Sequence, residues 1–470
     1  MSDRCLSVKE KIAFGIGAVG KDMVYMLSAS YILYYYQDIM GVSAVAMGII
    51  LLAARVFDAF NDPVMGVIVA KTKTRWGKFR PWLVIGTVTN AVVLFLMFAA
   101  PPSLDGAGLV AYAAVTYILW GVTYTMMDIP FWSMIPAFTK AGKERENMSA
   151  LGRSCAGVGS AIVTIVTVLA VRALGTMTQG AEASSKLIER SGYKWFSLVI
   201  AVLFVIFTLF MCLTIKEKST VDMKSAGVGE MFRALLKNDQ AVVMVIAIVL
   251  INTALYTTSN LTIYFFKYDF GGADAWEGQY TLFNTASGGF QILAMMILFP
   301  VLRKFMNTLK IMYTSFVMAF LGYVSLLAIS LSGATNVYLL MIPAFLIMSA
   351  LGMMNVILTV FLANTCDYGE LKNGRRDESV IFSMQTFVVK LASGLAALFA
   401  SLILQFTKIS DLSKLADIQI ASDASRLGLR FSMTLIPMVF MLVAIFIFSK
   451  KYTLTDERMD EIQKQLAELK

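Results

Sequence analysis

Residues 44–70, AVAMGIILLAARVFDAFNDPVMGVIVA, decide how the rest of the chain is read. The stretch is long and apolar enough to cross a bilayer, yet residues 55–63 (RVFDAFNDP) carry several polar side chains. Charged groups at the centre of a membrane helix cost about 2.5–3.5 kcal/mol each, so a cluster of them indicates a paired, aqueous site. The cluster follows i, i+3, i+6, i+7 spacing, which places it on one helical face: Arg55, Asp58, Asn61 and Asp62.

The whole chain has the composition of an integral membrane protein. It contains 470 residues, of which 58% are hydrophobic, and its mean hydropathy is +0.71, far above that of a soluble domain. Apolar runs of about 20 residues recur along it, so we predict an all-α membrane protein with twelve transmembrane helices. The first six are expected at 12–36, 44–70, 81–100, 109–136, 148–174 and from 195 to 214, and the second six start near residues 240, 276, 309, 337, 379 and 431.

A long polar interruption divides these helices into two sets of six. We predict a first bundle at 1–215, a cytoplasmic linker at 216–239 and a second bundle at 240–450. Residues 451–470 are predicted to form an amphipathic tail helix that lies on the protein or on the membrane surface. Its apolar positions follow helical spacing: Met459, Ile462, Leu466 and Leu469.

The basic residues orient the chain in the cell membrane. The net charge is +9, but the charges lie in short loops, of which residues 71–80 (KTKTRWGKFR) are the densest. The positive-inside rule places this loop and both termini in the cytoplasm. We therefore expect contact with membrane lipid and no binding of nucleic acid. The first helix carries Lys21 and Asp22 and has no cleavage site behind it, so we expect it to be retained rather than removed as a signal peptide.

Several classes of function are disfavoured by what the sequence lacks. The chain has no histidine, which excludes a histidine proton relay and histidine-based metal or triad chemistry. It has no GxxxxGK[ST] motif, so coupling to ATP within this chain is not expected. We find no constellation of nucleophile and base, and we expect neither enzymatic activity nor an organic cofactor. A sensor or scaffold that has lost transport is a further alternative, disfavoured by the full set of intramembrane charges.

Asp58 and Asp62 lie one turn apart and suggest a site for a monovalent cation. Two ionised carboxylates facing one cavity repel each other unless a cation or a proton intervenes, and hard oxygen ligands suit Na⁺. Asn61 could add a carbonyl oxygen and Thr125 a hydroxyl group. The alternative is a structural salt bridge with Arg55, although one arginine cannot neutralise two aspartates.

A second polar stripe lies in YTMMDIPFW, residues 124–132. Tyr124, Asp128 and Trp132 follow i, i+4, i+8 spacing, and a carboxylate flanked by aromatic rings is typical of sugar sites, where a ring packs on the apolar face of the pyranose. Pro130 can bend this helix around a ligand. Lys21, Asp22 and Arg153 would add polar contacts to the sugar. The alternative is that the aromatic residues are packing and that the charges lock three helices together.

The sequence resembles the glycoside-pentoside-hexuronide:cation symporter family, and within it the melibiose carriers, over essentially its full length. The motifs that carry the resemblance are FGIGAVGKD (14–22), ARVFDAFNDPVMG (54–66), RWGKFRPW (75–82), YILWGVTYTMMDIPFWSMIP (117–136) and DYGELKNGRRDES (367–379). The resemblance implies the major facilitator fold and symport of a sugar with a cation. It implies that the cation ligands are Asp58, Asn61, Asp62 and Thr125, and that the sugar contacts are Lys21, Asp22, Tyr124, Asp128, Trp132 and Arg153, with Lys390 approaching both sites.

Two residues depart from the family pattern. Asn355 stands where the melibiose carriers have a tryptophan facing the sugar, and Asn364 replaces an aspartate in the same helix. These differences weaken the case for melibiose itself and leave other galactosides, glucosides, pentosides and hexuronides open. The sequence thus predicts a secondary transporter coupled to Na⁺, or to H⁺ or Li⁺. The alternative is an H⁺-coupled carrier of a pentoside, a hexuronide or a non-sugar solute such as a lysolipid or drug.

Overall fold

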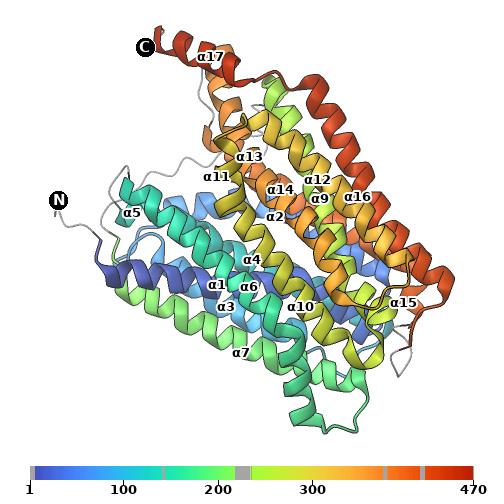
Figure 1. Ribbon diagram of the computed structural model, residues 1–470. Helices are drawn as coiled ribbons and strands as arrows, with labels where there is room; N and C mark the ends of the chain where they lie inside the picture. Colours follow the sequence, from blue (N-terminus) through green and yellow to red (C-terminus); the bar gives the residue numbers. More distant parts are fainter. Residues whose placement is uncertain are drawn as a thin grey trace. The chain divides into compact units, whose positions relative to one another are not determined.

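The computed structural model describes residues 6–139, 143–217, 233, 236–373, 378–412 and 419–468. These ranges are helical and contain no β-strand (Figure 1). Within them, twelve helices are long and apolar enough to cross a membrane, which confirms the predicted all-α membrane class. Large apolar side chains such as Val92 and Ile206 are 55% and 53% exposed, whereas Lys21 and Arg55 are each 4% exposed. This inversion of the usual pattern is expected where lipid replaces water as the solvent.

Residues 6–217 belong to one compact unit. In this unit α1 and α7 pack on each other, α6 packs on both, α2 packs on α4, and α3 packs on α4 and α7. The bounds are α1 Val8–Tyr34 with the π-helical turn η1 Tyr35–Ile39, α2 Ala44–Lys71, α3 Arg80–Phe98, α4 Gly106–Ser133, the short α5 Ile135–Phe138, α6 Lys143–Gln179 and α7 Ser185–Thr214.

The described residues from 233 onward belong to a second compact unit. In it α9 packs on α14 and α16, and α12 packs on α13. The bounds are α9 Asp239–Phe265 with the π-helical turn η2 Phe266–Phe270, α10 Gly272–Leu293 with η3 Ala294–Leu298, α11 Phe299–Arg303, α12 Thr308–Leu331, η4 Val337–Leu340, α13 Met341–Asn373, α14 Glu378–Phe406, α15 Ile409–Leu412, α16 Asp423–Lys451 and α17 Asp456–Glu468. Most of the expected linker at 216–239 lies outside the described residues.

Two helices begin eight or more residues earlier than their apolar runs suggest. We expected the sixth span after Lys194 and the twelfth near Phe431, but α7 begins at Ser185 and α16 at Asp423. The additional turns are polar, and their polar side chains pair with other parts of the protein. In α7, Glu189 accepts a hydrogen bond from the Tyr34 hydroxyl at 2.6 Å. Hydropathy alone therefore places the start of these two helices too late.

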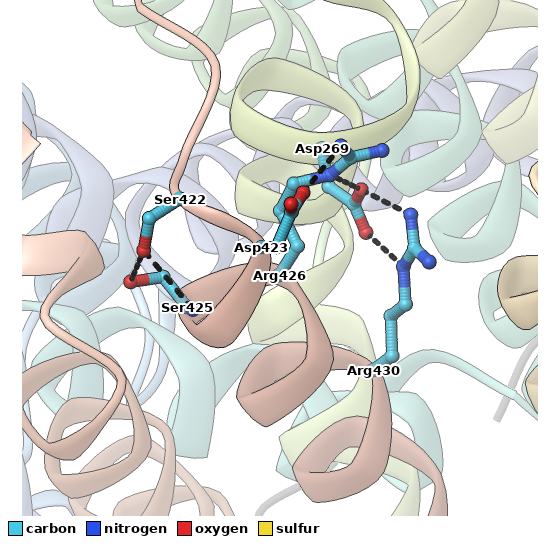
Figure 2. A network of polar contacts seen from close by, with 6 residues as sticks. All are labelled: Asp269, Ser422, Asp423, Ser425, Arg426 and Arg430. Carbon is cyan, nitrogen blue, oxygen red and sulfur yellow. Dashed lines mark hydrogen bonds and ion pairs between the residues drawn. The ribbon is translucent and has the colours of Figure 1, made fainter.

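The extra turns of α16 hold a buried ion cluster. Figure 2 shows the Asp269 carboxylate, in the turn η2, between the guanidinium groups of Arg426 and Arg430 on α16. Arg430 donates to both carboxylate oxygens, at 2.6 and 2.7 Å, and Arg426 Nε donates at 2.6 Å. The Asp269 side chain has no exposed surface. Charge-assisted bidentate pairing of this kind fixes the end of the first helix of the unit to the start of α16.

The predicted tail helix is present as α17, and it lies on the protein. Leu454, Met459, Ile462 and Leu466 form a buried apolar cluster against side chains that include Tyr368 of α13. Ile462 has no exposed surface. The predicted apolar stripe is thus confirmed for three of its four positions, and Leu469 lies outside the described residues.

Candidate functional site

Lys21 on α1 is the centre of one buried polar cluster. Its ammonium group donates to the Asp128 carboxylate at 2.7 Å and lies 2.9 Å from the Tyr124 hydroxyl oxygen, both on α4. It also lies 3.5 Å from the Asp22 carboxylate. Since the Lys21 side chain is only 5% exposed, these oxygens replace the water that a lysine normally requires. The cluster is therefore a paired intramembrane site of the kind that the sequence predicted.

Aromatic rings surround this charge cluster. The Lys21 ammonium lies 5.3 Å from the ring centres of Tyr124 and Trp132. The Trp132 indole donates to the Asp128 carboxylate at 3.1 Å, and its ring lies 5.1 Å from the exposed guanidinium group of Arg153 on α6. An acceptor carboxylate, a cation and a fixed indole ring are the groups that would hold the hydroxyl groups and the apolar face of a sugar.

Arg55 and Asp58 on α2 form a second buried pair. Arg55 Nη1 lies 3.3 Å from Asp58 Oδ2, and both side chains are 5% exposed. The guanidinium group also lies 5.8 Å and 6.0 Å from the ring centres of Tyr117 and Trp120 on α4. The salt bridge of the alternative interpretation is therefore present for Asp58. It leaves the role of Asp62 open.

Asp62 is held by α4 at the next turn. Its carboxylate accepts a hydrogen bond from the Thr125 hydroxyl at 2.8 Å. The Asn61 amide nitrogen is buried and has no hydrogen-bond partner among the described residues. Because the two ends of an amide exchange by rotation of the side chain, the same position can present the Asn61 carbonyl oxygen. Two carboxylates, a hydroxyl and an amide are the hard oxygen ligands that suit a monovalent cation.

The two clusters meet on consecutive residues of α4. Tyr124 is hydrogen-bonded to Lys21 in the first cluster, and Thr125 to Asp62 in the second. A helix shift that moves one of these contacts therefore moves the other. This adjacency gives the unit a direct physical link between the two candidate sites.

Three residues near the site were not singled out from the sequence. Tyr117 and Trp120 stack on each other with ring centres 5.8 Å apart and flank Arg55. A Cβ atom at Gly121 would lie 2.6 Å from Asp58 Oδ1, so only glycine permits this approach of α2 to α4. Tyr117, Trp120 and Gly121 continue the stripe of Tyr124 toward the N-terminus of α4, and extending the periodicity by two turns would have found them.

Not every predicted site residue can be placed in this constellation. The structure brings together ten of them in the first unit: Lys21, Asp22, Asp58, Asn61, Asp62, Tyr124, Thr125, Asp128, Trp132 and Arg153. Lys390 lies on α14, and Asn355 and Asn364 lie on α13, all in the second unit. The approach of Lys390 to both sites stays a prediction.

Solved structures of transporters have the same fold. The chain resembles the D-xylose-proton symporter with a TM-score of 0.64 and 15% identity, covering 95% of this chain and 98% of that one. It resembles a bacterial homolog of the human lysosomal transporter Spinster with a TM-score of 0.66 and 12% identity, covering 93% and 95%. At these identities the likeness establishes the fold alone, and that fold is the one of the major facilitator transporters.

Relatives of known sequence identify the family. The chain is 27% identical to the raffinose carrier protein of Pediococcus pentosaceus, over 97% of this chain and 71% of that protein. It is 29% identical to the isoprimeverose transporter of Lactiplantibacillus pentosus, over 84% and 79%, and 24% identical to the inner membrane symporter YicJ of Escherichia coli (strain K12), over 100% and 96%. The model of the MFS/sugar transport protein family matches residues 13–456. The chain is therefore a multi-pass membrane transporter, not an enzyme, and belongs to the glycoside-pentoside-hexuronide:cation symporter family of the major facilitator superfamily.

Proposed function

We propose that the chain carries a glycoside into the cell together with one monovalent cation, by alternating access of its two halves. The observation that carries this proposal is the adjacency of Tyr124 and Thr125, which joins a sugar-type site to a cation-type site on one helix. The ligands of the proposed cation site are Asp58, Asn61, Asp62 and Thr125. The proposed sugar site comprises Lys21, Asp22, Tyr124, Asp128, Trp132 and Arg153.

A charge count supports a single cation. In the sugar-type cluster, Lys21 and Arg153 balance Asp22 and Asp128. In the proposed cation site, Arg55 carries one positive charge and Asp58 and Asp62 two negative charges, so these three side chains sum to one net negative charge. One monovalent cation neutralises that charge, whereas a divalent ion would leave an uncompensated positive charge inside the membrane, which is costly. Na⁺ is the cation that the oxygen ligands favour, and H⁺ or Li⁺ could use the same carboxylates.

The names of the relatives indicate the substrate class. Raffinose and lactose contain a galactosyl unit and isoprimeverose a xylosyl unit, and the corresponding relatives are carriers or permeases of these sugars. We infer that this chain transports a small glycoside with a galactosyl or xylosyl unit. Asn355 replaces the tryptophan expected in melibiose carriers, so an H⁺-coupled carrier of a pentoside or hexuronide is the second candidate. The positive-inside rule assigns both termini to the cytoplasm of the producing cell.

The test is uptake of radiolabelled sugars into membrane vesicles with and without an inward Na⁺ gradient. The panel contains an α-galactoside, a β-galactoside, a β-xyloside and a glucuronide. Uptake of one sugar stimulated by Na⁺ supports the proposal and names the substrate. Uptake driven only by an acid-outside gradient favours the proton-coupled alternative. Absence of uptake under both gradients, from protein shown to be folded, contradicts sugar symport.

A further inference from the structure

The loop between α2 and α3 is folded into a fixed turn. The Thr74 hydroxyl donates to the Gly77 carbonyl at 2.7 Å and accepts from the Trp76 backbone N–H at 3.2 Å. Gly77 has a φ of +112°, a backbone conformation that residues other than glycine rarely adopt. The backbone of this loop is therefore determined by its sequence and is more than a flexible connection.

A carboxylate from the segment that follows α7 fixes this turn. Glu217 accepts the backbone N–H groups of Lys78 at 2.7 Å, Phe79 at 3.0 Å and Arg80 at 3.0 Å. These are the groups that the start of α3 would leave unsatisfied, so Glu217 acts as the cap of that helix. The Arg80 side chain donates in turn to the Cys212 carbonyl on α7. The Glu217 carboxylate thus accepts three hydrogen bonds from backbone N–H groups.

The outer surface of the turn is basic. The side chains of Lys71, Lys73 and Arg75 are exposed, and no carboxylate of the described residues forms an ion pair with them. Trp76 follows Arg75 in the chain and is 47% exposed, and the Arg80 guanidinium group lies 5.4 Å from its ring centre. A tryptophan next to unpaired cations at the end of a membrane helix is typical of the zone of lipid headgroups.

We propose that this turn, residues 71–80, is a binding site for the phosphate headgroup of an anionic phospholipid. Membrane orientation depends on the number of basic residues in a loop and does not require a folded turn. The fixed backbone instead holds Lys73, Arg75 and Trp76 in one turn, so that phosphate oxygens meet two cations while the indole ring lies at the boundary between the headgroups and the acyl chains. The charge of the turn selects an anionic headgroup over a zwitterionic one.

The test measures quenching of Trp76 fluorescence in the full chain. The purified protein is placed in phosphatidylcholine nanodiscs that contain an increasing fraction of brominated phosphatidylglycerol, and the Trp76→Phe variant supplies the background of the other tryptophans. We expect half-maximal quenching at a low fraction of phosphatidylglycerol, and a much higher fraction when brominated phosphatidylcholine is used. Equal quenching by the two lipids would overturn the proposal.

Charge variants test which residues are responsible. Each basic residue near a membrane surface contributes about 1 kcal/mol, so the double variant Lys73→Gln/Arg75→Gln should bind phosphatidylglycerol about 30-fold more weakly. Lys304→Gln/Lys310→Gln removes two exposed charges, one after α11 and one in the first turn of α12, and should leave the Trp76 signal unchanged. Equal behaviour of the two double variants contradicts the site.

A third variant distinguishes binding that requires the folded turn from binding that depends on charge alone. Glu217→Ala keeps every basic residue and adds one net positive charge, but it removes the cap that holds the turn. If charge alone attracts the lipid, this variant binds phosphatidylglycerol more tightly than the wild type. The proposal requires weaker binding, because the turn that carries the cations and Trp76 is no longer fixed.

Discussion

Replacement of Asp62 by asparagine is the sharpest test of the proposed cation site. The change removes the carboxylate that accepts the Thr125 hydroxyl hydrogen bond at 2.8 Å and leaves Asp58 paired with Arg55 at 3.3 Å. The charges of Arg55, Asp58 and residue 62 then sum to zero. Because asparagine has the same shape and can still accept the hydroxyl, the substitution changes the charge with little change in packing.

The size of the effect follows from the lost Coulomb attraction. A cation about 4 Å from a carboxylate gains about 4 kcal/mol at an effective dielectric constant of about 20, and Asp62 is only partly buried. Asp62→Asn should therefore weaken Na⁺ binding by up to about three orders of magnitude. Binding of the sugar should survive in the absence of Na⁺, because the contacts of Lys21 with Asp128 and Tyr124 are unchanged.

The assay is calorimetric titration of Na⁺ into purified protein, followed by titration of the transported sugar with and without Na⁺. Asp105→Asn is the matched control, since it makes the same chemical change at an exposed position at the start of α4. Retention by Asp62→Asn of Na⁺ affinity within about threefold of the wild type would refute the assignment. Loss of both ligands would indicate misfolding, which the melting temperature of the variant would reveal.

Three further substitutions probe the clusters on which the fold depends. Lys21→Met leaves Asp128 without its buried cation, so thermal unfolding in detergent should show a loss of about 2 kcal/mol together with loss of sugar binding. Arg430→Gln removes two charge-assisted hydrogen bonds from Asp269 and should cost about 3 kcal/mol while sugar affinity stays within a few-fold. Ile462→Ala creates a cavity beneath α17 and should cost about 2–4 kcal/mol, and greater protease sensitivity confined to the tail would be its signature. An unchanged melting temperature in any of the three would contradict the contact on which it rests.

The polar positions of the membrane helices could be predicted because charged groups at such positions cost free energy, and a paired or binding site accounts for that cost. Asp58 and Asp62 on α2, and Tyr124 and Asp128 on α4, were identified by spacing alone, and the structure places their side chains in two hydrogen-bonded clusters. The partners could not be derived in this way. That Thr125 holds Asp62, and that Arg55 pairs with Asp58, depends on how α2 packs on α4, which helical periodicity does not determine.

The ends of the helices were harder to predict than their centres. Hydropathy places a boundary where polar residues begin, whereas α16 continues through Arg426 and Arg430 because Asp269 neutralises them. The π-helical turns escaped prediction for a related reason. The first of them, η1, places the hydroxyl groups of Tyr35 and Tyr36 on the carbonyl groups of Phe98 and Met97, which the end of α3 leaves unsatisfied. Such tertiary hydrogen bonds leave no periodic trace in the sequence.

The two halves repeat their scaffold but not their site. The first helix of each half ends in a π-helical turn whose fourth residue is a buried aspartate, Asp38 in η1 and Asp269 in η2. Each of these ends is hydrogen-bonded to the sixth membrane-spanning helix of its own half. Tyr34 donates to Glu189 of α7 in the first half, and Arg430 of α16 donates to Asp269 in the second.

Apart from Lys390, the intramembrane charged residues that the sequence singled out lie in the first half. Both halves have a polar link between the end of the first span and the sixth span, and these links help to hold each bundle together. A binding site needs only one cluster of each kind, so the second half does not require the charges that the first half carries. We conclude that different residues serve binding and stability. Substitutions at the hydrogen-bonded helix ends should alter the stability of the half that contains them. Substitutions at the charged residues of the first half should alter binding.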